Sequence, residues 1–117
     1  MTSNSEPTAV TATYFDAWRK GDLAALRSVL ADDADFAGPL AQLGNADDMV
    51  QTMQRLVQVT TDIVIRKVFA DGPDVLTWFD LHTADAPPCP VANWSHVNAG
   101  KIDRVRVTFD PRPLIGG

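Results

Sequence analysis

The sequence predicts an α+β fold, with three N-terminal helices packed on a strongly curved, mostly antiparallel sheet that forms a cone-shaped pocket. Up to about residue 60, apolar residues recur at helical spacing. Beyond that point, segments rich in β-branched and aromatic residues alternate with turn residues. The breaks between these segments are short, as in hairpins that join antiparallel strands. Helices and strands are therefore separate along the chain, and the twist of a long sheet predicts the curvature.

The helices are predicted from their spacing and their end signals. Residues 8–20 place Val10, Tyr14 and Trp18 on one face, and Gly21 follows as a C-cap. A second helix is expected from an N-cap at Asp22 to about residue 30. The segment GPLAQLGN is expected to be a loop, after a short strand at residues 35–37, and residues 46–57 form the third predicted helix.

The second half of the chain predicts four strands, at residues 61–70, 74–83, 90–98 and 101–110. The segments DGP, ADAPP and AG separate them. A chain of 117 residues fits one core, so we expect a disordered polar tail at residues 1–7 and a single domain at residues 8–117.

Charge and cysteine content limit the partners. A net charge of −5 and an isoelectric point near 4.7 argue against nucleic acids and anionic membranes, which are approached through clustered Lys and Arg. The single cysteine, Cys89, cannot form an internal disulfide, and no zinc-type spacing is present. No signal peptide or membrane span is evident. We expect a cytoplasmic protein without metal or cofactor.

The strand at residues 74–83 carries the candidate catalytic pair. Asp80 and His82 are two residues apart and therefore share a face. If the turn sets Thr83 opposite Pro90, five side chains lie on one face of the hairpin. If the strand pairing slips by one residue, Phe79 lies opposite Asn93 instead. The five are Trp78, Asp80, His82, Asn93 and Ser95.

This predicted face suggests proton transfer. Burial raises the pKa of a carboxylate and a neighbouring imidazolium lowers it, so Asp80 and His82 would be suited to exchange a proton near neutral pH. Tyr14 and Asn93 would donate hydrogen bonds to an oxygen that gains charge. The alternative interpretation is a buried polar plug in which Asp80, His82 and Asn93 bond to one another.

The order of elements resembles the nuclear transport factor 2-like superfamily over residues 8–114. The similarity lies in GDLAALRSVLADDADF after the first helix, the Gly-Pro loop, and GKIDRVRVTFD near the end. Relatives include SnoaL-like polyketide cyclases, ketosteroid isomerases and limonene-epoxide hydrolases. The resemblance implies a homodimer through the outer face of the sheet, with Trp94 and His96 at the interface.

Two catalytic sets known in this superfamily are incomplete here. Tyr14 matches the pocket tyrosine of ketosteroid isomerases, but Gly38 stands where their general base stands, and Asn93 stands near the place of their protonated acid. Asp80 matches one Asp of limonene-epoxide hydrolases and is implied to point into the cone. Their Arg and second Asp positions hold Trp78 and Val107.

The sequence therefore supports two classes of function. The first is a small cofactor-independent isomerase, cyclase or lyase that acts on a hydrophobic molecule by acid-base catalysis with Asp80 and His82. The second is a non-catalytic small-molecule-binding or dimerisation module, and a further alternative is epoxide hydrolase-like activity with a changed catalytic set. The expected ligand-binding residues are Tyr14, Trp18, Trp78, Asn93, Ser95, Val107 and Phe109.

Overall fold

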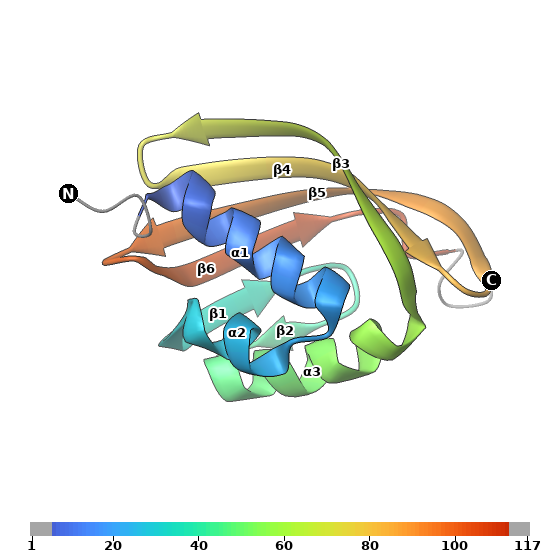
Figure 1. Ribbon diagram of the computed structural model, residues 1–117, viewed down its shortest axis with the longest axis horizontal. Helices are drawn as coiled ribbons and strands as arrows, with labels where there is room; N and C mark the ends of the chain where they lie inside the picture. Colours follow the sequence, from blue (N-terminus) through green and yellow to red (C-terminus); the bar gives the residue numbers. More distant parts are fainter. Residues whose placement is uncertain (1–5, 113–117) are drawn as a thin grey trace.

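A computed structural model describes residues 6–112 of the chain (Figure 1). Three helices and six strands follow one another as α1 (Pro7–Lys20), α2 (Leu23–Ser28), β1 (Leu30–Ala37), β2 (Gln42–Leu43), α3 (Ala46–Val59), β3 (Thr60–Asp71), β4 (Asp74–Thr83), β5 (Ala86–Asn98) and β6 (Lys101–Thr108). The predicted α+β class is confirmed. Most of the predicted tail lies outside the described residues, and Pro7 already belongs to α1.

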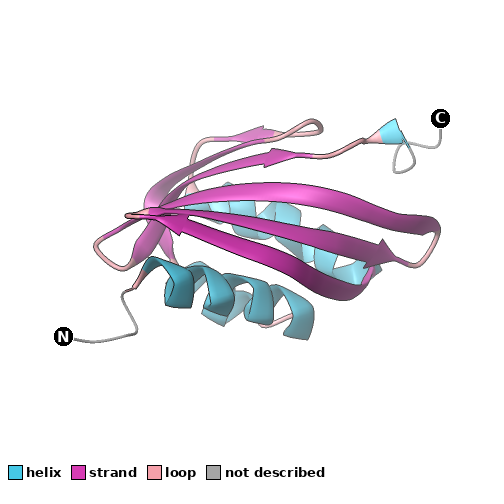
Figure 2. Ribbon diagram, turned by 90° about the horizontal axis from the view of Figure 1, so that it is seen from above, coloured by secondary structure: helices cyan, strands magenta, loops and turns pink. Residues whose placement is uncertain are grey.

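The sheet is open, with the strand order β2-β1-β6-β5-β4-β3. Neighbouring strands are antiparallel except β1 and β6, which run parallel. In Figure 2 the strands run side by side as one twisted layer, with α1 packed along it. Within residues 6–112, no helix is long and apolar enough to cross a membrane.

The helix ends follow the sequence signals. Gly21 adopts φ 70°, and its N–H and that of Asp22 bond to the carbonyls of Trp18 and Ala17, which ends α1. Asn45 accepts a hydrogen bond from the Asp48 N–H at 2.8 Å and caps α3. The second helix is shorter than expected: it ends at Ser28, because the chain from Leu30 onward pairs with β6.

The β4–β5 hairpin has a different register from the predicted one. Asn93 pairs with Thr77, three residues before the expected partner Asp80. A shift by an odd number of residues exchanges the two faces of one strand relative to the other. The turn of the hairpin is shorter than predicted, because Thr83 pairs with Ala86 and not with Pro90. The proline-rich segment at residues 86–90 is therefore part of β5.

Proline is tolerated there because this end of β5 has a partner on one side only. Strand β6 pairs with β5 from Ala92 onward, whereas β4 already pairs with Pro90 and Cys89. A proline ring nitrogen that points toward the unpaired side removes no ladder hydrogen bond. The sequence turn signal at ADAPP thus places the hairpin correctly but overestimates its length.

Buried and less buried side chains alternate along β4 and along most of β5. In β4, Val75, Phe79 and Leu81 are buried on the face that the helices cover, whereas Leu76 and Trp78 are exposed on the opposite face. We call these the inner and outer faces of the sheet. The core lies between the inner face and helices α1 and α3.

Candidate functional site

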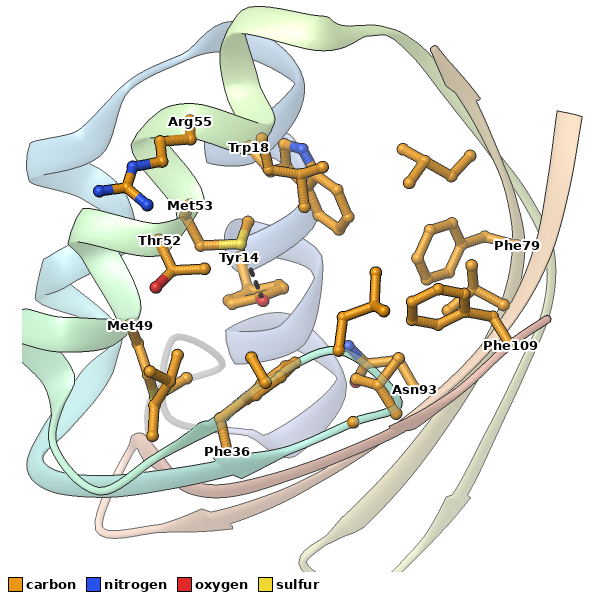
Figure 3. Close-up of a pocket in the computed structure, with 18 of the residues that line it drawn as sticks. Tyr14, Trp18, Phe36, Met49, Thr52, Met53, Arg55, Phe79, Asn93 and Phe109 are labelled. Carbon is orange, nitrogen blue, oxygen red and sulfur yellow. Dashed lines mark hydrogen bonds between the residues drawn. The ribbon is translucent and has the colours of Figure 1, made fainter. Parts of the chain in front are cut away.

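A pocket of about 450 Å³ lies between the inner face of the sheet and helices α1 and α3 (Figure 3). Its walls come from α1, the segment around β2, α3, and strands β4, β5 and β6. Nearly all of them are apolar, and the volume falls within the range of sites that bind drug-sized molecules. The few polar groups that face this space therefore determine what it can recognise.

Tyr14 presents a hydroxyl group to the pocket from α1. Its side chain is buried and packs edge-on against Phe15 and Trp18, with ring centroids 5.1 and 6.4 Å away. The hydroxyl donates a long contact of 3.9 Å to Met53 Sδ, a weak acceptor (Figure 3). Burial raises the pKa of Tyr14 well above its usual value of 10. The phenol therefore stays neutral and is a hydrogen-bond donor.

Asn93 approaches the same space from β5, on the wall opposite Tyr14 (Figure 3). The side chain is 2% exposed, and its Oδ1 accepts a hydrogen bond from Ser95 Oγ at 2.9 Å. Within residues 6–112, Nδ2 of Asn93 donates to no acceptor, and no side-chain nitrogen or oxygen there is sealed off without a partner. The free amide donor of Asn93 is therefore accessible from the pocket.

Trp18 forms a wall rather than a polar contact. Its Nε1 donates to Thr60 Oγ1 at 3.1 Å, and that hydroxyl donates to the carbonyl of Leu56 at 2.7 Å. These bonds fix α1 to the junction of α3 and β3. The ring itself packs at 85° to Phe79, with centroids 5.7 Å apart. The expected placement of Val107 and Phe109 along the pocket is also observed.

The expected inward placement of Asp80, His82 and Trp78 is wrong. All three lie on the outer face of β4, because Phe79 and Leu81 occupy the inner face and the register differs by an odd number of residues. Asp80 accepts two hydrogen bonds from Arg66, at 2.9 and 2.7 Å. Trp78 is 42% exposed, and neither it nor Asp80 nor His82 lines the pocket.

Ser95 shares the inner face with Asn93 but lies behind it and does not line the pocket. The sequence also missed part of the wall, because it did not assign the inner face of β4 or the face of α3 to the site. Phe79, Leu81 and Met53 all line the pocket. The alternation of these apolar residues with Asp80 and His82 was the signal that could have identified the inner face.

Titratable groups are scarce at this site. Among the described residues, the pocket lining contains no carboxylate and no imidazole, and its one charged side chain is Arg55, which is exposed on α3. No group of three metal-ligating side chains occurs within residues 6–112. Cys89 is buried, and its pKa is raised by desolvation and by the charges of Asp110 and Asp80, so its thiolate is disfavoured.

The fold is shared with several solved structures. An NTF2-like protein of unknown function from Cytophaga hutchinsonii has a TM-score of 0.83 at 22% identity, over 93% of this chain and 94% of that chain. A candidate ketosteroid isomerase from Kribbella flavida has a TM-score of 0.80 at 19% identity, over 93% and 79%. An LEH-like epoxide hydrolase from M. tuberculosis has a TM-score of 0.79 at 18% identity, over 98% and 89%.

At these identities, the similarity establishes the fold alone. No curated protein sequence matches this chain. The resemblance seen in the sequence is nevertheless confirmed at the level of the family. The model of the SnoaL-like domain matches residues 11–105, which is most of the chain, and the protein therefore belongs to the SnoaL-like domain family.

Proposed function

We propose that this protein binds a hydrophobic small molecule that carries an oxygen acceptor, and that the pocket is the cone-shaped cavity expected from the sequence. The observation that carries the proposal is the pair of hydrogen-bond donors in an apolar cavity. Asn93 Nδ2 has no acceptor among the described residues, and the Tyr14 hydroxyl has only the weak acceptor Met53 Sδ. An apolar cavity gives affinity by burying the body of the ligand, whereas a few polar groups fix its orientation. A carbonyl oxygen is the complement of two donors.

The same geometry favours binding over acid-base catalysis. General acid-base catalysis needs a titratable group within hydrogen-bond reach of the reacting atom. Asp80 and His82, the expected pair, lie on the outer face, and the described lining holds no carboxylate or imidazole. The non-catalytic binding module is therefore our first choice among the functions that the sequence suggests.

Cofactor-independent isomerase, cyclase or lyase chemistry is the second candidate. Two donors on one oxygen would stabilise negative charge that develops there. Similar structures include proteins named for isomerisation and for epoxide hydrolysis. In this version Tyr14 and Asn93, rather than Asp80 and His82, are the catalytic residues. Time-dependent conversion of a bound ketone, lost in Asn93→Leu, would favour this candidate over binding alone.

Binding in the pocket is tested with 9-fluorenone, a rigid tricyclic ketone, by isothermal titration calorimetry. The unsubstituted protein is expected to bind it at micromolar concentration. Val107→Trp introduces a larger side chain into the lining and should abolish binding. Trp78→Ala, on the outer face, is the control and should leave the affinity unchanged. Equal affinity for all three proteins would place the ligand outside this pocket and overturn the proposal.

We also propose that the protein forms a homodimer through the outer face. Phe69, Leu76 and Trp94 pair across β3, β4 and β5 in one row, and each is exposed. They line a shallow groove beside Asp74, which accepts a hydrogen bond from Trp94 Nε1 at 2.9 Å. Exposed apolar patches of this kind mark interfaces. His96, on the same face, contacts Asp103 at 2.6 Å.

The charges of this face suit a second copy of the same chain. Arg66 pairs with Asp80, and Arg106 pairs with Asp35, so much of the charge beside the apolar row is already neutralised. Sedimentation velocity at micromolar concentration should show a dimer. Leu76→Glu should yield a monomer, whereas Gln54→Glu, on exposed α3, should not. A monomeric unsubstituted protein would exclude the interface. The cytoplasm remains the proposed compartment, in keeping with a single cysteine.

A further inference from the structure

Four polar side chains are buried among the described residues, namely Thr11, Thr77, Asn93 and Ser95. Asn93 pairs directly with Thr77 on β4, and Ser95 follows it on the same face of β5. These three form a small polar region on an otherwise apolar inner face, and Asn93 alone of them lines the pocket. A buried hydroxyl is costly unless it is hydrogen-bonded, so the partner of Ser95 is informative.

That partner is Asn93. Ser95 Oγ donates to Asn93 Oδ1 at 2.9 Å, and the two side chains are 1% and 2% exposed. A side-chain amide has one acceptor end and one donor end, and a rotation of 180° exchanges them with little change of shape. A turned amide could still donate to Ser95 Oγ, but the buried Ser95 hydroxyl hydrogen would then lose Asn93 Oδ1, the one acceptor it has among the described residues. The observed orientation, with the acceptor end toward the interior of the sheet, is therefore favoured. The donor end then faces the pocket.

We infer that Ser95 is a positioning residue that fixes the orientation of the Asn93 amide, so that Asn93 presents only its donor end to the pocket. The sequence predicted Ser95 as a ligand contact; in the structure its hydroxyl bonds to Asn93, and Ser95 does not line the pocket. The consequence is selectivity for a ligand atom that accepts hydrogen bonds, such as a carbonyl oxygen, over one that only donates. This inference rests on the proposed function, because it concerns the ligand of the same pocket.

Three tricyclic probes of nearly equal shape distinguish a ligand atom that accepts hydrogen bonds from one that donates them and from one that does neither. At the same position, 9-fluorenone carries an acceptor, fluorene carries a methylene group, and carbazole carries an N–H donor. The unsubstituted protein should bind 9-fluorenone about tenfold more tightly than fluorene, and carbazole no better than fluorene. In Ser95→Ala the amide is free to turn. The preference for 9-fluorenone should fall to about threefold or less while the affinity for fluorene stays the same.

Carbazole gives a readout that loss of packing would not produce. In Ser95→Ala its affinity should rise relative to fluorene, because a turned amide offers Oδ1 to the N–H group. Ser95→Thr keeps the hydroxyl and should keep the original order of affinities. Thr77→Val is the matched control, because it removes an equally buried hydroxyl beside Asn93 at nearly constant volume. It should also keep the original order.

The outcomes are distinct. Full retention of the 9-fluorenone preference in Ser95→Ala, or an equal loss in Thr77→Val, would overturn the role of Ser95. Equal binding of all three probes by the unsubstituted protein would also overturn it but leave the pocket as a binding site. Binding of none of them would overturn the proposed function, and this inference with it.

A second measurement avoids dependence on a variant that fails to fold. In the unsubstituted protein, the side-chain amide protons of Asn93, assigned through their correlation with the Asn93 Cβ, are followed by NMR. Saturation with 9-fluorenone should shift them downfield, and saturation with fluorene should not. Shifts of the same size and direction with both probes would contradict a donor end directed at the ligand.

Discussion

Tyr14 is the only tyrosine in the chain, and its hydroxyl faces an apolar pocket with a sulfur atom as its hydrogen-bond acceptor. Burying a neutral phenol there requires little free energy, whereas burying a phenolate requires much more, because burial disfavours the charged form. Asn93 brings the second donor to the same space. We therefore expect recognition in this pocket to depend on these two neutral donors; the one charged side chain of the described lining, Arg55, is exposed.

The raised pKa of Tyr14 predicts a specific weakness at high pH. Below pH 10, Tyr14 is neutral in the folded and the unfolded chain, and its contribution to stability is fully present. Above pH 10, the unfolded chain ionises first, so stability is lost as the pH rises toward the folded pKa. Between pH 10 and 11 the unsubstituted protein should lose about 1 kcal/mol more than Tyr14→Phe.

Urea unfolding of both proteins at several pH values from 9 to 11 measures this difference in stability. The two proteins have the same lysines, so the effect of lysine ionisation on stability cancels in the comparison. Because Tyr14 is the single tyrosine, phenolate absorbance reports its titration directly. Parallel loss of stability in both proteins, together with phenolate formation near pH 10 in the folded state, would contradict a buried hydroxyl.

Asp80 is predicted to contribute little to stability. Its side chain is 18% exposed and its carboxylate bonds to Arg66, which is 55% exposed; an ion pair with one solvent-exposed partner is screened by water and is usually worth about 1 kcal/mol or less. Asp80→Asn should therefore lower the free energy of unfolding by no more than that amount between pH 5 and 8. Chemical denaturation measures it. A loss above about 2 kcal/mol would instead assign Asp80 to a buried polar network.

At the scale of elements, the sequence predicted which segments are strands better than how they pair. The apolar and turn signals placed β4 correctly, but they began β5 at residue 90, four residues too late. The register depends on where the hairpin closes, and prolines that read as a turn are in fact paired strand residues opposite β4. Because the register differs by three residues, Asp80 and Trp78 lie on the opposite face of the sheet from Asn93 and outside the predicted site. The residues on α1, where helical spacing alone decides the face, were placed correctly.

The end of α1 offers an element-scale prediction. Gly21 has φ 70°, and a Cβ atom there would lie 3.2 Å from Val57 Cγ1 on α3. Gly21→Ala should cost about 1–2 kcal/mol, because alanine is strained in the left-handed region and would also crowd α3. Gly44→Ala is the matched control: a Cβ there meets nothing within 4 Å, so its effect should be small.

Urea unfolding of the two glycine variants gives the comparison. An equal effect of both substitutions would mean that neither the backbone conformation nor the contact with Val57 constrains the end of α1.

At the scale of the whole molecule, the pocket exists because α1, α3 and the sheet come together with apolar faces. The sequence predicted the fold class and the family, since both follow from the order and periodicity of the elements. It also placed Tyr14, Trp18, Val107 and Phe109 correctly at the pocket. The pairing register of the central hairpin could not be derived, because no local signal sets the residue at which the hairpin closes, and a slip of one residue exchanges the faces of one strand relative to the other.

We propose that Asn93 on the inner face holds the ligand and that Asp80 on the outer face does not. Calorimetric titration of 9-fluorenone into the unsubstituted protein, Asn93→Leu and Asp80→Asn distinguishes the two residues. We expect about tenfold weaker binding to Asn93→Leu and unchanged binding to Asp80→Asn. Weaker binding to Asp80→Asn with unchanged binding to Asn93→Leu would exclude Asn93 as the ligand contact.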